Sequence, residues 1–122
     1  MAKVLVIDDE PGVRGVMCRV LEAVGHDVVD FGNGGGAIEH VRQQPADLLI
    51  TDLFMPDVEG IETIREIHRL RPDLPIIAVS GIDFEGGDYL NVARKFGAVA
   101  TLKKPFSPAD LLDLVSRVLS LA

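Results

Sequence analysis

Three aspartates stand directly after hydrophobic runs. Asp8 and Asp9 follow Val4–Ile7, and Asp52 follows Leu48–Thr51. At the carboxyl edge of a parallel sheet, such side chains face a ligand crevice, whereas the apolar residues before them form the core. Because clustered carboxylates repel each other, a hard divalent cation or a lysine such as Lys104 is needed to compensate them. We therefore predict a phosphoryl site with magnesium.

The chemistry centres on Asp52, which the other acidic residues flank. A carboxylate can be the nucleophile that forms an aspartyl phosphate, provided that the anionic phosphoryl group is neutralised. Mg²⁺ prefers oxygen ligands and keeps several waters, so Asp9, Asp52 and the carbonyl of Phe54 are a sufficient protein share. Lys104 adds a positive charge on the far side of the phosphoryl group.

Two further residues end another apolar run, Ile76–Val79. Ser80 offers a hydroxyl that can donate a hydrogen bond to a phosphoryl oxygen. Gly81 lets the backbone approach closely because it has no side chain. We expect both residues at the phosphoryl-binding site.

The elements that position these residues alternate between strand-like and helical patterns five times, which is typical of βα units around a parallel sheet. We expect helices that begin at Pro11 and Asn33, a third through Ile61–Leu70, a fourth capped by Gly97, and a fifth after a capping box at Ser107. The predicted strands are residues 3–8, 27–31, 46–52, 75–80 and 99–103. The fold class is thus α/β with a doubly wound parallel sheet.

Composition limits the possible functions. The 122 residues, 48% of them hydrophobic, fit one domain over residues 1–122 with no output domain. The net charge of −7 argues against direct nucleic-acid binding, which needs clustered Lys and Arg. The single cysteine, Cys18, cannot form an internal disulfide. Because no run is long enough for membrane insertion and no signal peptide precedes the first strand, we expect a cytoplasmic protein.

The motifs together resemble the receiver (REC) domain of two-component response regulators, from Lys3 to the C-terminus. The pair Asp8-Asp9, the segment 52–56 with Gly60, Ser80-Gly81, and Lys104-Pro105-Phe106 occur in the order and approximate spacing of that family. The resemblance implies a flavodoxin-like (βα)5 fold with strand order 2-1-3-4-5. It is to the stand-alone, chemotaxis-regulator-like, single-domain type.

The resemblance also implies roles for individual residues. Asp52 would be the phosphorylation site, Asp8 and Asp9 would organise Mg²⁺, Ser80 would be the hydroxyl switch residue, and Lys104 would contact the phosphoryl group. Such a domain takes a phosphoryl group from a sensor histidine kinase or a histidine phosphotransfer protein and then changes its affinity for a downstream target protein. It is not an enzyme beyond its own phosphotransfer and slow autodephosphorylation. We expect a monomer.

The chain departs from the family pattern at two places. Thr101 stands three residues before the lysine, where many receivers carry Tyr or Phe as part of the switch. The stretch 81–88 is about two residues longer than usual and rich in glycine, so we predict a mobile loop. We expect phosphorylation to reorder this loop and the neighbouring face of the fourth helix, fifth strand and fifth helix without an aromatic rotation.

Simpler interpretations remain open. Asp8 or Asp9 alone could be a helix N-cap, Ser80 a strand-end hydroxyl and Lys104 a solvated charge. At the level of the whole domain, the alternatives are a flavodoxin-like ligand-binding domain, an aspartyl-phosphate phosphohydrolase, and a degenerate receiver used as a protein-binding scaffold. Phe54 stands where a phosphohydrolase would need a second carboxylate, and the intact Asp9, Asp52 and Lys104 argue against the scaffold.

Overall fold

Five parallel strands form a single sheet in the computed structural model, which describes residues 2–53, 59–80 and 93–121. The sheet order is β2-β1-β3-β4-β5, as the resemblance implied. The predicted α/β fold class and strand order are therefore confirmed. The strands are β1 (Lys3–Ile7), β2 (Asp27–Phe31), β3 (Leu48–Asp52), β4 (Ile76–Ser80) and β5 (Ala100–Lys103).

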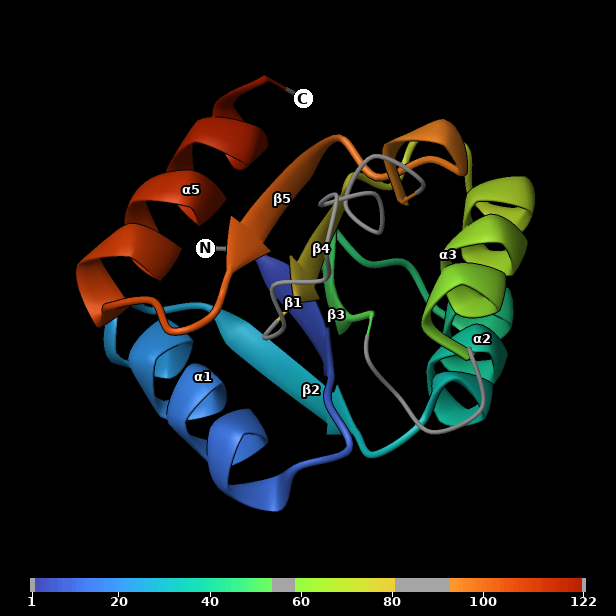
Figure 1. Cartoon of the computed structure of the whole chain (residues 1–122). Coiled ribbons are helices and arrows are strands. Elements are labelled where there is room, and N and C mark those ends of the chain that lie inside the picture. The colour runs from blue at the N-terminus through green and yellow to red at the C-terminus, as the bar shows by residue number, and fades with distance from the viewer. Residues whose placement is uncertain (1, 54–58, 81–92, 122) are drawn as a thin grey trace.

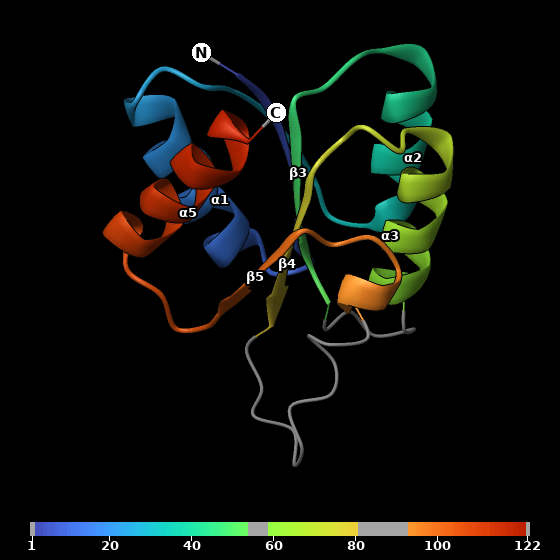
Figure 2. The same ribbon diagram turned by 90° about the horizontal axis from the view of Figure 1, so that it is seen from above.

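The helices cover both faces of this sheet (Figure 1). Figure 2 shows α1 (Pro11–Ala23) and α5 (Pro108–Ser120) on one face, and α2 (Gly34–Gln43) and α3 (Glu59–Leu70) on the other. Right-handed crossovers between parallel strands place helices in this way when the chain reverses its winding direction beside β1. The carboxyl ends of the central strands consequently open together at one edge of the sheet.

The core consists of two apolar layers, one on each face of the sheet. Alternate residues of β1 point to opposite faces, so Leu5 and Ile7 pack towards α2 and α3, whereas Val4 and Val6 pack towards α1 and α5. All four side chains are fully buried. A strand that is apolar on both faces is what a doubly covered parallel sheet requires.

The helix boundaries follow the local signals in the sequence. Pro11 is the first residue of α1, and the side chain of Asn33 accepts a hydrogen bond of 3.1 Å from the N–H of Gly36 at the start of α2. The side chain of Ser107 accepts a hydrogen bond of 3.0 Å from the N–H of Asp110, and the Asp110 carboxylate accepts one from the N–H of Ser107. The capping box predicted for the last helix is present.

The predicted fourth helix falls largely outside the described residues. Residues 93–95 are helical, and a turn at Gly97 follows, where the backbone has a φ of 131°. Few residues other than glycine adopt that backbone conformation, so Gly97 is suited to end the helix as the sequence indicated.

The helices α2 and α3 approach each other closely at Gly34. A Cβ atom on this glycine would lie 2.0 Å from Oγ1 of Thr63, whose side chain is buried. Because such a distance is far below van der Waals contact, the absence of a side chain at Gly34 permits this packing. Gly34 thus serves as a contact point between two helices.

The longest of these helices, α1 and α5, have 13 residues each. Within the described ranges, no helix combines the length and the apolar character needed to cross a membrane.

Candidate functional site

The carboxyl edge of the sheet gathers four of the predicted site residues. Asp8 directly follows β1, Asp52 ends β3, Ser80 ends β4, and Lys104 directly follows β5. Ile7 is paired with Thr51 in the sheet register, so the two residues that follow, Asp8 and Asp52, come side by side. Strands far apart in the chain therefore deliver their terminal side chains to one place, since Asp8 and Lys104 are 96 positions apart.

Three carboxylates form a compact group at this edge. One oxygen each from Asp8, Asp9 and Asp52 lie within 4.8 Å of one another. The side chains of Asp8 and Asp52 are buried, whereas Asp9 is exposed. Buried like charges at this separation destabilise each other unless a cation lies among them.

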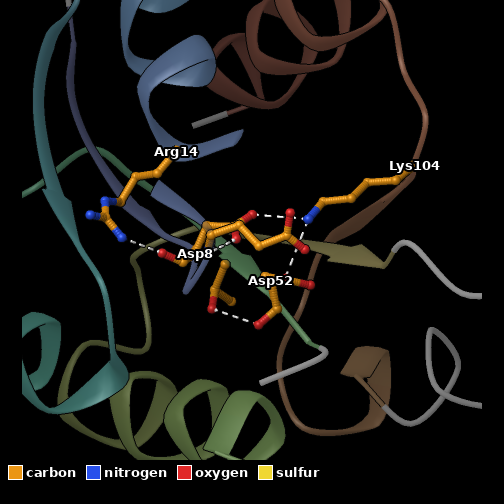
Figure 3. Close-up of polar contacts among 6 residues, drawn as sticks. Asp8, Arg14, Asp52 and Lys104 are labelled. Atoms are coloured by element: carbon orange, nitrogen blue, oxygen red, sulfur yellow. Dashed lines mark hydrogen bonds and ion pairs between the residues drawn. The ribbon is translucent and has the colours of Figure 1, made fainter. Parts of the chain in front are cut away.

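Lys104 provides one such cation from within the chain. Its Nζ lies 3.0 Å from Oδ2 of Asp8 and 3.3 Å from Oδ2 of Asp52 (Figure 3). Burial by itself would lower the pKa of Lys104, but the hydrogen bonds and negative charges of Asp8 and Asp52 outweigh it and raise this pKa above 10.5. The lysine is therefore fully charged at neutral pH and bridges the ends of β1 and β3.

Asp8 has a local structural role as well. Its Oδ1 accepts a hydrogen bond of 2.9 Å from the N–H of Glu10, and its own N–H donates one of 3.1 Å to the carbonyl of Phe31. Glu10 occupies the N-cap position of α1 without a side-chain cap. The interpretation of Asp8 or Asp9 as the N-cap of this helix is therefore wrong, because Glu10 holds that position; one oxygen of Asp8 instead bonds the N–H of the N-cap residue and the other contacts Lys104.

Ser80 and Lys104 are joined through the backbone. The N–H of Lys104 donates a hydrogen bond of 2.7 Å to the carbonyl oxygen of Ser80, and the Lys104–Pro105 peptide bond is cis. Ser80 is 3% exposed at the end of β4. Its place puts the hydroxyl-bearing side chain at the same edge as the carboxylates.

Thr101 lies apart from this group. It is half-buried within β5 and pairs in the register with Ala78, two positions before the pair of Ser80 with Lys103. The other predicted site residues, Phe54 and Gly81, fall outside the described residues, as does the predicted loop through residue 88.

One residue of the site was missed by the sequence analysis. Nη1 of Arg14, on α1, donates a hydrogen bond of 2.6 Å to the carbonyl oxygen of Asp8, and its Nε lies 2.9 Å from Oδ2 of Asp30. The available signal was a basic residue in the first turns of the helix that follows the acidic pair, placed beside the apolar stripe. Nothing in the spacing showed that Asp30, near the end of β2, would be its partner.

Three carboxylates beside a half-buried lysine, at the carboxyl edge of a doubly wound sheet, define an acidic site suited to a hard cation and an anionic group. The chain matches the family described as the response regulator receiver domain over residues 4–116. It therefore belongs to the receiver domains of two-component response regulators, which are signalling switches phosphorylated on an aspartate.

Individual relatives agree with this assignment. The chain is 32% identical to the response regulator receiver protein CpdR of Brucella abortus, over 98% of both chains. It is 37% identical to the transcriptional regulator NtrC of Azospirillum brasilense, of which it covers only 24%. A CheY-like receiver domain from Methanospirillum hungatei superposes with a TM-score of 0.91 at 27% identity, covering 98% of this chain and 94% of that one.

Proposed function

We propose that this receiver domain accepts a phosphoryl group on Asp52 from a phosphohistidine donor, with Mg²⁺ present, and that the phosphorylated domain has a changed affinity for a partner protein. The observation that carries the proposal is the position of Asp52. Its carboxylate lies at the carboxyl edge of the sheet, 3.3 Å from Nζ of Lys104 and within 4.8 Å of a carboxylate oxygen of Asp8 and of Asp9. A nucleophile, a charge that can neutralise the incoming group and a set of cation ligands are thus within reach of one another.

The transfer step uses the groups of this chain as follows. A carboxylate oxygen of Asp52 attacks the phosphorus and forms a P–O bond, while the P–N bond to the donor imidazole breaks and its electron pair stays on that nitrogen. Lys104 neutralises negative charge on the phosphoryl oxygens. To do so, its ammonium group gives up part of its contact with Asp8 and Asp52 and contacts these oxygens instead. Ser80 donates a hydrogen bond to one of these oxygens, and we place Gly81 beside it.

The described residues fit a magnesium ion. The oxygen-only donor set of Asp8, Asp9 and Asp52 is the kind that Mg²⁺ prefers, and we propose the carbonyl of Phe54 as a further ligand. When bound, the ion supplies positive charge against the attacking carboxylate and the phosphoryl oxygens. Asp8, Asp9 and Asp52 would hold it, and Asp52 would also supply the oxygen that reacts.

The output of the switch is a change of surface. Receiver domains interact with histidine kinases or phosphotransfer proteins. We propose such a donor here, a separate downstream protein as the target, and Ser80 with Thr101 as the residues that relay the change. Because Thr101 has no aromatic ring, the relay proceeds without a ring rotation. We further propose that the domain works as a cytoplasmic monomer, as one folded unit.

The test is the intact mass of the protein after incubation with acetyl phosphate, with and without Mg²⁺. We expect a gain of one phosphoryl group that requires Mg²⁺ and is lost in Asp52→Asn. Asp113→Asn, which changes an exposed aspartate of α5, is the matched control and should gain the group normally. No gain from acetyl phosphate or from a phosphorylated phosphotransfer protein would contradict the proposal. If Mg²⁺ binding were also absent, the protein-binding scaffold would be the remaining interpretation.

A further inference from the structure

Arg14 ties together three elements beside the acidic site. Its side chain extends from α1 and bonds both the carbonyl oxygen of Asp8, at 2.6 Å, and the carboxylate of Asp30, at 2.9 Å. Figure 3 shows Arg14 approaching Asp8 from the side opposite to Lys104. The Arg14 side chain is 21% exposed and that of Asp30 47%, so this pair lies at the rim of the site.

The contact with Asp8 falls on the peptide that joins the two acidic residues. The carbonyl that Arg14 holds belongs to the Asp8–Asp9 peptide group, and the N–H of Asp8 is held by the carbonyl of Phe31. The backbone here is therefore fixed on both sides of the Asp8 Cα atom. Asp9 is exposed, so the orientation of the Asp8–Asp9 peptide group sets the position from which the Asp9 side chain extends.

The surroundings leave room for the guanidinium. A Cβ atom on Gly32 would lie 3.2 Å from Nη1 of Arg14, which is a crowded distance. The residue that follows β2 is thus one whose small size accommodates Arg14. The small size of Gly32 therefore agrees with the position of Arg14 that the two hydrogen bonds indicate.

We propose that Arg14 is a positioning residue for the divalent cation. It acts through the Asp8–Asp9 peptide, which it holds by the Asp8 carbonyl while Asp30 anchors the guanidinium. This inference rests on the proposed function, since it concerns the same cation site. Residues that orient metal ligands without touching the metal commonly change metal affinity by about 10–100-fold when they are replaced.

The experiment is a Mg²⁺ titration of the full chain, followed by the amide signals of Asp8 and Asp9 in NMR spectra. We expect Arg14→Gln to raise the Mg²⁺ dissociation constant by about tenfold or more. Arg14→Lys should recover part of the affinity, because an ammonium can still donate to the Asp8 carbonyl. Asp30→Asn should give a smaller increase, since it loosens the anchor only. Arg19→Gln, at an exposed position of the same helix, is the matched control and should match the wild type.

A second readout separates positioning from a general structural role. The rate of phosphorylation by acetyl phosphate is measured against Mg²⁺ concentration, and we expect the half-saturating concentration of Arg14→Gln to change more than its limiting rate. Circular dichroism identifies variants that fail to fold; if Arg14→Gln is one, Arg14→Lys and Asp30→Asn decide. A folded Arg14→Gln with the same Mg²⁺ affinity as Arg19→Gln would overturn the inference. If Arg14→Gln does not fold, unchanged Mg²⁺ affinity in both Arg14→Lys and Asp30→Asn would overturn it.

These outcomes are distinct from a failure of the proposed function. If the wild type binds Mg²⁺ with the expected dependence on Arg14 but takes up no phosphoryl group, the positioning role stands and the phosphoryl-acceptor proposal fails. If the wild type is phosphorylated normally and the folded Arg14 variants bind Mg²⁺ as it does, the reverse holds.

Discussion

The main-chain N–H of Lys104 donates a 2.7 Å hydrogen bond to the carbonyl oxygen of Ser80. This bond continues the pairing of β4 with β5 by one residue beyond the strand ends. The lysine is consequently held beside Ser80 by its backbone, while its side chain spans β4 and β3 to reach Asp52 and Asp8. The position of its charge depends on the sheet as a whole.

Replacing Lys104 should leave Asp8 and Asp52 facing each other without an internal cation. We expect Lys104→Met to lower the free energy of unfolding by about 1.5–3 kcal/mol without Mg²⁺, the range for hydrogen bonds to charged groups. Added Mg²⁺ should reduce this loss, because a bound ion supplies the missing positive charge. Urea unfolding with and without Mg²⁺ measures both effects, with Lys95→Met at an exposed position as the control. An equal loss at all Mg²⁺ concentrations would contradict this explanation.

The ion pairs of Lys104 also make stability depend on alkaline pH. Their effect is to raise the pKa of Lys104 in the folded protein above the ordinary 10.5, so the folded state binds this proton more tightly than the unfolded chain. The stabilisation is therefore fully present below pH 10.5 and is lost as the pH rises through the raised value. Urea unfolding across this interval should show a steeper decline for Lys95→Met than for Lys104→Met. Parallel declines would show that Lys104 does not contribute.

Mg²⁺ should stabilise the folded domain through its three carboxylates. A ligand that binds only the folded state at 100 times its dissociation constant adds about 2.7 kcal/mol to the free energy of unfolding. We expect a gain that follows this relation in the wild type and is much reduced in Asp9→Asn. Since Asp9 is exposed, this variant should fold normally without Mg²⁺ and be slightly more stable because a charge repulsion is removed. Thermal unfolding with Mg²⁺, and with Ca²⁺ as a comparison, tests this; an equal Mg²⁺ gain in both proteins would exclude Asp9 as a ligand.

The contact between Gly34 and Thr63 predicts a packing defect away from the site. Gly34→Ala places a methyl group where Oγ1 of Thr63 lies, and we expect it to destabilise the domain by about 1–3 kcal/mol, as overpacking does. Gly35→Ala is the control, because its methyl group would meet only the Asn33 side chain at 3.4 Å. Thr63→Ala in the Gly34→Ala background should recover part of the loss. A double-mutant cycle from urea unfolding that gives no coupling would contradict direct contact.

The elements themselves were predictable from the sequence. Apolar runs and periodic stripes placed the strands within two residues of their observed ends, and Pro11 and Ser107 marked helix starts that the structure confirms. These signals are local, because a cap or an amphipathic stripe involves residues a few positions apart. Asp52 and Lys104 could be selected for the same reason, since Asp52 ends one recognisable strand and Lys104 directly follows another.

The relations between elements were less accessible. The strand order came from the resemblance to a family, and hydrophobic periodicity alone does not specify which strands are neighbours. The contact of Gly34 with Thr63 was not anticipated for the same reason, because the sequence predicted a helix beginning at Asn33 but not which helix would pack against it. Only the packing of α2 on α3 shows that Gly34 must lack a side chain.

The sequence by itself determined the kind of chemistry: three carboxylates and a lysine at strand ends, suited to a cation and a phosphoryl group. The tertiary structure decided how these charges meet. It brings Lys104 to within 3.0 Å of Asp8, across 96 positions of the chain, and it gives the Asp8 carbonyl to Arg14. The physical reason is that strand ends become neighbours only when the strands pair in their final register. Burial of both apolar faces of the sheet stabilises this pairing, and no local pattern encodes it.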